Sequence, residues 1–208
     1  YGQVLDDDEA PDTVKSRAQG LRSAYTAEGE AAKVAAMTSL CGAAAAGADY
    51  HGALVMTARA AALIRPDEAH AGAADQLIAS MFTTGLDRNA AAWARIVDEG
   101  TLGWALLALG SPTRVAPMDS GALGDFYGSD DSEKAHKSAL LLAGLAGLGR
   151  VDAGAQSDFG RDLEVNVTRQ TQWSRAITAA DERGEQGTVA LMAIAGMQAP
   201  NWSLVPAN

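Results

Sequence analysis

Cysteine is almost missing from this sequence of 208 residues, and that absence limits the chemistry available to it. The single cysteine, Cys41, cannot form an internal disulfide. It lies among small residues, where a cysteine usually serves as a small buried apolar side chain. The three histidines lie far apart, and neither a HExxH motif nor a cysteine pair is present, so the sequence predicts no metal site and no cofactor.

Positive charge is also scarce. The chain has 16 lysines and arginines against 26 aspartates and glutamates, a formal net charge of −10. No lysine or arginine cluster is present to neutralise phosphates, so the sequence predicts no nucleic-acid partner. The longest apolar runs, Leu102 to Leu109 and Ala139 to Leu148, are well short of the roughly 20 residues that cross a bilayer. We therefore predict no transmembrane segment.

Sequence signals of catalysis are missing as well. No Gly-x-Ser-x-Gly nucleophile elbow is present. The tetrapeptide Asp67-Glu68-Ala69-His70 resembles a helicase motif, but no glycine-rich phosphate loop precedes it, and a helix start with acidic residues in its first turn explains it. The sequence thus predicts that the chain is not an enzyme and has no catalytic residues or small-molecule ligand.

What the sequence does contain is typical of helices. Aromatic residues make up 5% of the chain, and the alternation of Val, Ile and Thr that marks strands is rare. Alanine, which has the highest helix propensity, is abundant. We therefore predict an all-α fold.

One helical pattern occurs twice. The segment Asp87 to Gly110 recurs in altered form at Thr168 to Met197, where Trp93-Ala94-Arg95 aligns with Trp173-Ser174-Arg175. In the first copy we expect Asp87 to cap a helix, Gly100 to end it, and Thr101 to cap the next. The second helix is apolar nearly all round, as expected of a helix buried between neighbours. The pattern predicts stacked antiparallel hairpins in an α-solenoid-like array; coincidence in an alanine-rich chain is the alternative.

The domain organisation follows from turn signals and periodicity. An acidic leader, predicted to be flexible, covers residues 1–11, and a single helical repeat domain covers residues 12–199. Within it, a long loop is predicted at residues 111–132, where three turn-forming clusters occur. Residues 200–208 form an irregular tail. We also expect Thr26, Asp49, Ser132 and Asp152 to begin helices.

The predicted loop contains the candidate metal and partner residues. Four carboxylates lie close in sequence, at Asp125, Asp130, Asp131 and Glu133, so a calcium site was weighed against helix capping. Their spacing does not fit the EF-hand pattern, which favours capping and solvated carboxylates. The aromatic pair Phe126 and Tyr127 is a candidate for contact with a partner.

The tail offers a second candidate contact. Trp202, Leu204 and Val205 are large apolar residues beyond the last helical period, where a monomeric array would place a polar cap. We expect these residues to bind a partner subunit or further helices.

Three segments carry a resemblance to a known group of proteins. AALIRPDEAHAGAADQLIASM, SALLLAGLAGLGRVD and ITAADERGEQGTVALMAIAGMQ resemble the C-terminal part of large, uncharacterised, alanine-rich bacterial proteins that often carry an export signal. The resemblance covers Tyr50 to Asn208. It implies a periplasmic or cell-envelope location, with a cytoplasmic one left open, and a longer natural chain.

Two functions are consistent with these patterns. The first is a structural or protein-interaction module, a helical scaffold whose partners are other protein subunits. The alternative is an enzyme that acts on a cell-wall or other polymer through carboxylates in a helical groove, with Asp98/Glu99 and Asp181/Glu182 as candidate pairs. The alternative requires two carboxylates from different hairpins to face one another across a cleft.

Overall fold

The structure, a computed structural model, is built of helices and turns. It describes residues 2–44, 47–113, 120–164, 172–185, 187–189 and 191–192, and these contain no strand, so the all-α prediction is confirmed. The α-helices are α1 Gly2–Leu5, α2 Asp12–Thr26, α3 Glu30–Gly42, α4 Ala48–Ala61, α5 Ala74–Phe82, α6 Asp87–Ala91, α7 Leu102–Gly110, α8 Ser120–Ser129, α9 His136–Gly147, α10 Ala153–Asp162 and α11 Gln172–Glu182. Short 3-10 helices lie between them: η1 Glu68–Ala73, η2 Ala92–Arg95 and η3 Glu133–Ala135.

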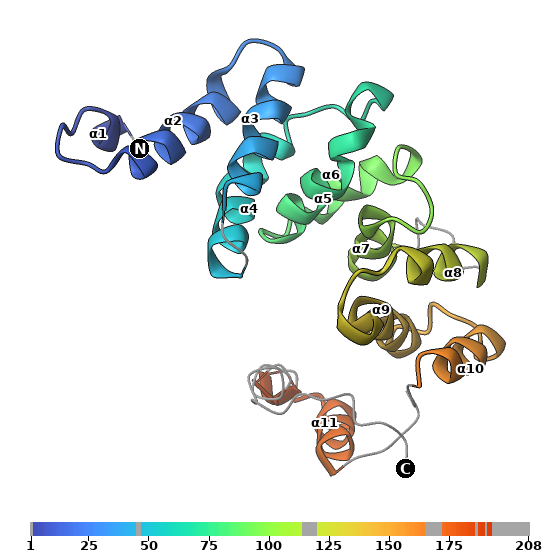
Figure 1. Ribbon diagram of the computed structural model, residues 1–208. Helices are drawn as coiled ribbons and strands as arrows, with labels where there is room; N and C mark the ends of the chain where they lie inside the picture. Colours follow the sequence, from blue (N-terminus) through green and yellow to red (C-terminus); the bar gives the residue numbers. More distant parts are fainter. Residues whose placement is uncertain are drawn as a thin grey trace. The chain divides into compact units, whose positions relative to one another are not determined.

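The chain divides into two compact units, Tyr1–Val151 and Asp152–Asn208. In the first unit α2 packs on α3, α3 on α4, α4 on α5, α5 on α7 and α7 on α9, so neighbours in space follow chain order (Figure 1). The second unit contains α10 and α11. Asp152 caps α10 as predicted, since its Oδ1 accepts the N–H of Ala155 at 2.8 Å. The single domain predicted over residues 12–199 stays a prediction.

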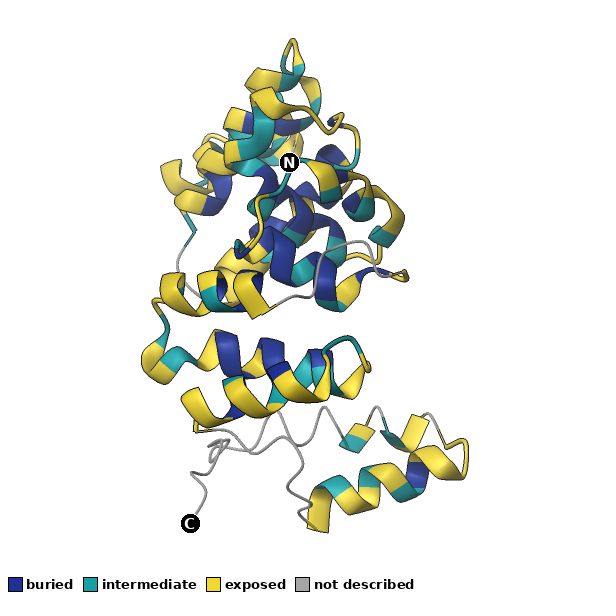
Figure 2. Ribbon diagram, turned by 90° about the vertical axis from the view of Figure 1, so that its right-hand side faces the viewer, coloured by how far each residue is buried: buried dark blue, intermediate teal, exposed yellow. Residues whose placement is uncertain are grey.

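Helix α7 is enclosed by other helices of the first unit. Its residues Trp104, Ala105, Leu107 and Ala108 are all buried, and it packs between α5 and α9. Figure 2 shows the buried residues of the first unit gathered on the inner faces of its helices. The prediction that this apolar helix is buried between neighbours is confirmed.

Close approach of α7 to its neighbours depends on glycine. A Cβ at Gly103 would lie 2.6 Å from Asp75 Oδ1 on α5, and a Cβ at Gly144 on α9 would lie 2.6 Å from a methyl carbon of Leu109. The start of α7 is also capped twice. Thr101 Oγ1 accepts the N–H of Trp104 at 3.3 Å, as predicted, and Asp75 Oδ1 accepts the N–H of Gly103 at 2.8 Å.

The end of α7 is held by an arginine from far along the chain. The guanidinium of Arg150 donates hydrogen bonds to the carbonyl oxygens of Ala108 at 2.7 Å, Leu109 at 3.1 Å and Ser111 at 2.8 Å. These carbonyls have no partner within the helix, and a cation beside them also complements the helix dipole. Arg150 is placed there by a Schellman turn after α9, in which its own N–H donates to Leu145 O and Gly149 has φ +61°.

The α3–α4–α5 contact contains a small buried polar cluster. Thr57 Oγ1 donates to the carbonyl of Ala53 at 2.8 Å and lies 3.2 Å from Ser80 Oγ. Cys41, 3% exposed, packs beside them, so the prediction of a buried small side chain is confirmed. Burial raises the pKa of the Cys41 thiol, although a hydrogen bond with Thr57 opposes the rise. A raised pKa favours the neutral thiol, which is a weaker nucleophile than the thiolate.

Several expectations about local structure are wrong. The predicted loop at 111–132 contains α8, because Ala122, Leu123 and Phe126 fall on one helical face and are buried despite the glycines between them. The acidic leader contains the short helix α1. Asp87 lies within α6, where its side chain makes no capping hydrogen bond. Thr26 ends α2 and bonds to Arg22 O instead of beginning α3.

The two tryptophan segments differ in local structure. The first is broken into α6 and η2 and buries Trp93, whereas the second forms the regular helix α11 and leaves Trp173 44% exposed. Trp173 Nε1 donates to the carbonyl of Met192 at 3.3 Å. The remainder of the second copy lies largely outside the described residues, and the repeat stays a prediction.

Candidate functional site

The first unit contains an open cleft of about 440 Å³ between α5, α7, α8 and α9. It is lined by Asp75, Glu99, Gly100, Thr101, Leu102, Asp125, Phe126, Ser129, Asp130 and Lys137. Four carboxylates from separate elements therefore meet around one hollow, together with one ammonium group. Two of the lining residues, Leu102 and Phe126, are apolar, and Phe126 is 5% exposed.

Gly100 brings the loop before α7 against α8. Its φ of +77° lies in the left-handed region that glycine adopts readily. A Cβ at this position would lie 2.7 Å from Asp125 Cβ and 3.1 Å from the Phe126 nitrogen. A larger residue would push the loop from α8, so Gly100 sets the width of the cleft on this side.

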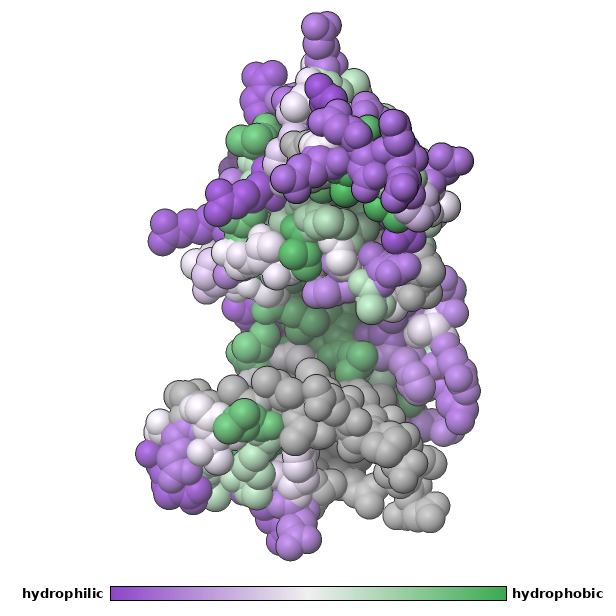
Figure 3. All heavy atoms as spheres, turned by 90° about the vertical axis from the view of Figure 1, so that its left-hand side faces the viewer, coloured by the Kyte–Doolittle hydropathy of each residue, from purple (hydrophilic) through white to green (hydrophobic). Residues whose placement is uncertain are grey.

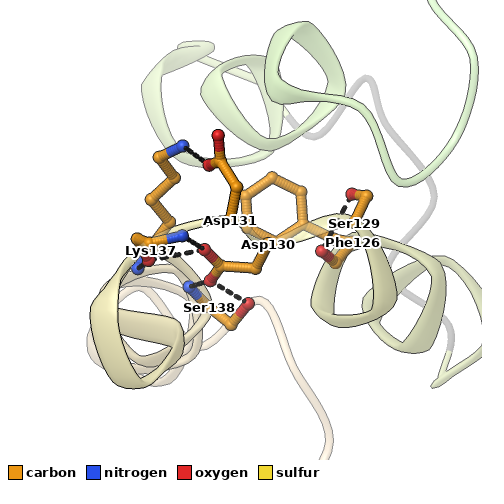
Figure 4. Close-up of polar contacts among 7 residues, drawn as sticks. Phe126, Ser129, Asp130, Asp131, Lys137 and Ser138 are labelled. Atoms are coloured by element: carbon orange, nitrogen blue, oxygen red, sulfur yellow. Dashed lines mark hydrogen bonds and ion pairs between the residues drawn. The ribbon is translucent and has the colours of Figure 1, made fainter.

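Asp130 is the most strongly bonded side chain of the site. One oxygen of its carboxylate accepts the N–H and the hydroxyl of Ser132, and the other accepts the N–H of Ser138 at 2.8 Å and its hydroxyl at 2.6 Å (Figure 4). Ser132 Oγ in turn accepts the N–H of Lys137 at 3.0 Å. Asp130 and Ser132 thus satisfy N–H groups in the first turn of α9.

The turn that these bonds hold has an unusual backbone. Lys134 and Ala135 have φ of 53° and 51°, in the left-handed region that is unfavourable for residues with a Cβ. Ser132, predicted to begin a helix, is the residue before the short helix η3, to which its side chain makes no capping hydrogen bond, and α9 starts at His136. The hydrogen bonds to Asp130 offset the strain of the two left-handed residues.

The pKa of Asp130 reflects the same hydrogen bonds. Partial burial acts to raise the pKa, but the bonds from Ser132 and Ser138 outweigh burial and lower it from 3.8 to about 2. A lowered pKa in the folded state means that the ionised carboxylate stabilises the fold above pH 3.8. That stabilisation is lost as the pH falls through about 2.

We therefore expect Asp130→Ala to lower the free energy of unfolding at pH 7 by about 1–2 kcal/mol, through loss of the cap. The difference from the wild type should shrink between pH 4 and pH 2, as the wild-type carboxylate becomes protonated. Urea unfolding followed by circular dichroism at several pH values measures this. Asp131→Ala is the control and should have a much smaller effect; an Asp130→Ala deficit that is unchanged at pH 2 would contradict the assignment.

Asp131 forms an ion pair with Lys137, one of the residues that line the cleft. The Lys137 ammonium donates to Asp131 Oδ1, and this hydrogen bond lowers the pKa of Asp131 and raises that of Lys137. The Asp131 side chain is 83% exposed, so solvent screens the pair and it adds little to stability.

The four carboxylates weighed for calcium are arranged for other roles. Asp130 already accepts four hydrogen bonds, and Asp131 is paired with Lys137. Asp125 faces the cleft from α8, whereas Asp131 and Glu133 are not among its lining residues. In the part of the chain that the structure describes, no three His, Cys, Asp or Glu side chains are grouped to hold a metal ion.

Two carboxylates of the cleft have no partner within the described residues: Glu99 and Asp125. The Asp75 carboxylate accepts a hydrogen bond from Gly103, and the Asp130 carboxylate accepts hydrogen bonds from Ser132 and Ser138. Glu99 and Asp125 can therefore accept hydrogen bonds from a cationic or hydroxyl group that enters the cleft. The sequence analysis named Glu99 in the candidate carboxylate pair Asp98/Glu99 and gave no role to Asp75; their meeting with Asp125 depends on the packing of α5, α7 and α8.

The candidate partner residues are only partly within the described structure. Phe126 is buried and lines the cleft, whereas Tyr127 is 41% exposed. Trp202, Leu204 and Val205 lie outside the described residues. Their contact with a partner stays a prediction.

Among the helices that the structure describes, none combines the length and apolar character required to cross a membrane.

Comparison with other proteins finds no relative. Neither the protein-family models, nor the curated proteins, nor the solved structures yield a match to this chain.

Proposed function

We propose that this chain is a helical scaffold that binds other protein subunits. The observation that carries the proposal is the order of packing in the first unit, where each helix contacts the next along the chain from α2 to α5 and then to α7 and α9. Packing between successive neighbours is typical of stacked helical arrays, which bind partners along an extended surface. An α-solenoid-like stack of hairpins is the arrangement we infer.

Apolar side chains on the surface support the same proposal. Met56 is 49% exposed and Leu63 is 67% exposed on and just after α4, and Leu140 and Leu148 are 45% and 52% exposed on and just after α9. Figure 3 shows hydrophobic residues reaching the surface between hydrophilic ones. Contiguous exposed apolar surface is a feature of protein interfaces. These side chains support a protein-interaction surface; the envelope location is proposed from the resemblance to exported bacterial proteins.

The test is the size of the protein in its native extract. We expect size-exclusion chromatography with light scattering to show the chain in a complex well above its own 21.4 kDa. Met56→Asp with Leu63→Asp, or Leu140→Asp with Leu148→Asp, should release it, because a charge at an apolar contact is costly to desolvate. Arg88→Gln, at an exposed position whose side chain is not apolar, is the control. A clean monomer with no co-purifying protein would contradict the proposal.

The cleft favours a second candidate function, an enzyme that acts on a polymer. Asp75, Glu99 and Asp125 line the cleft from three elements, whereas the candidate pair Asp181/Glu182 belongs to the second unit. The pKa of Asp130, the one cleft carboxylate with a resolved shift, is lowered, which is unsuited to a general acid near neutral pH.

The enzymatic alternative has a direct assay. If it holds, incubation with purified cell-wall glycan releases reducing ends, and Glu99→Gln or Asp125→Asn abolishes the release without unfolding the chain. Asp98→Asn is a suitable matched control, because Asp98 neighbours Glu99 but does not line the cleft. If the wild type, the variants and a sample without protein all release reducing ends at the same rate, the enzymatic alternative is wrong.

A further inference from the structure

We draw no further inference here: the strongest candidate, the exposed apolar face of α4 that carries Val55, Met56 and Leu63, carries nothing, because nothing in the structure shows what covers it.

Discussion

Leu107→Ala should lower the free energy of unfolding of the first unit by about 3–4 kcal/mol, the largest effect that we expect from one substitution. Leu107 is 0% exposed at the middle of α7, between α5 and α9. Truncation to alanine removes buried apolar surface and also leaves a cavity, because helices held close at Gly103 and Gly144 cannot easily collapse around it. Chemical unfolding followed by circular dichroism measures the loss.

Leu102→Ala is the matched control for Leu107→Ala. It makes the same change on the same helix, but Leu102 is 42% exposed, so much less apolar surface is lost. Alanine and leucine differ little in helix propensity, so the difference between the two variants reports mainly burial. Similar losses for both variants would mean that α7 is not enclosed by its neighbours.

Arg150→Met should destabilise the first unit by about 2–3 kcal/mol, the second largest effect expected. The substitution keeps an unbranched apolar stem but removes the hydrogen bonds to the carbonyls of Ala108, Leu109 and Ser111. The carbonyl oxygens then lose a charged hydrogen-bond donor. The helix itself supplies no other donor to the carbonyls at its C-terminal end. Amide hydrogen exchange should show faster opening of the last turn of α7, and unfolding experiments give the total loss.

Arg150→Lys separates geometry from charge. Lysine keeps the positive charge beside the end of α7, but its single ammonium cannot span carbonyls as the planar guanidinium does. We expect a loss in the free energy of unfolding that is smaller than that of Arg150→Met and larger than that of the control Arg88→Ala. Arg88 is exposed and has no partner among the described residues. A loss no larger than that of Arg88→Ala would show that the Arg150 hydrogen bonds contribute nothing to the stability of the fold.

Features that depend on nearby residues were predictable from the sequence. Thr101 and Asp152 cap helices as expected, since their side chains accept N–H groups at the starts of α7 and α10. The burial of α7 followed from its apolar residues on every side. Each of these signals acts within about one or two helical turns, so the residue types alone carry it.

The helix α8 shows where local signals mislead. Its glycines at positions 121, 124 and 128 and the neighbouring prolines and serines are typical of a loop. Three buried apolar residues on one face, Ala122, Leu123 and Phe126, outweigh that tendency, because packing against the unit stabilises a helix of weak propensity. The sequence placed Asp130 in the same loop and did not identify Ser138, eight residues away, as its partner.

By itself, the sequence determined that this protein is built of helices, where α7 and α10 begin, and that α7 is enclosed. The tertiary structure decided which distant residues meet: Arg150 with the end of α7, Asp75 with its start, and Glu99 with Asp125 around the cleft. Helix boundaries arise from hydrogen bonds between residues a few positions apart, which the sequence records directly. Contacts across tens of residues depend on how helices cross and how closely glycine lets them approach, and no short pattern encodes that geometry.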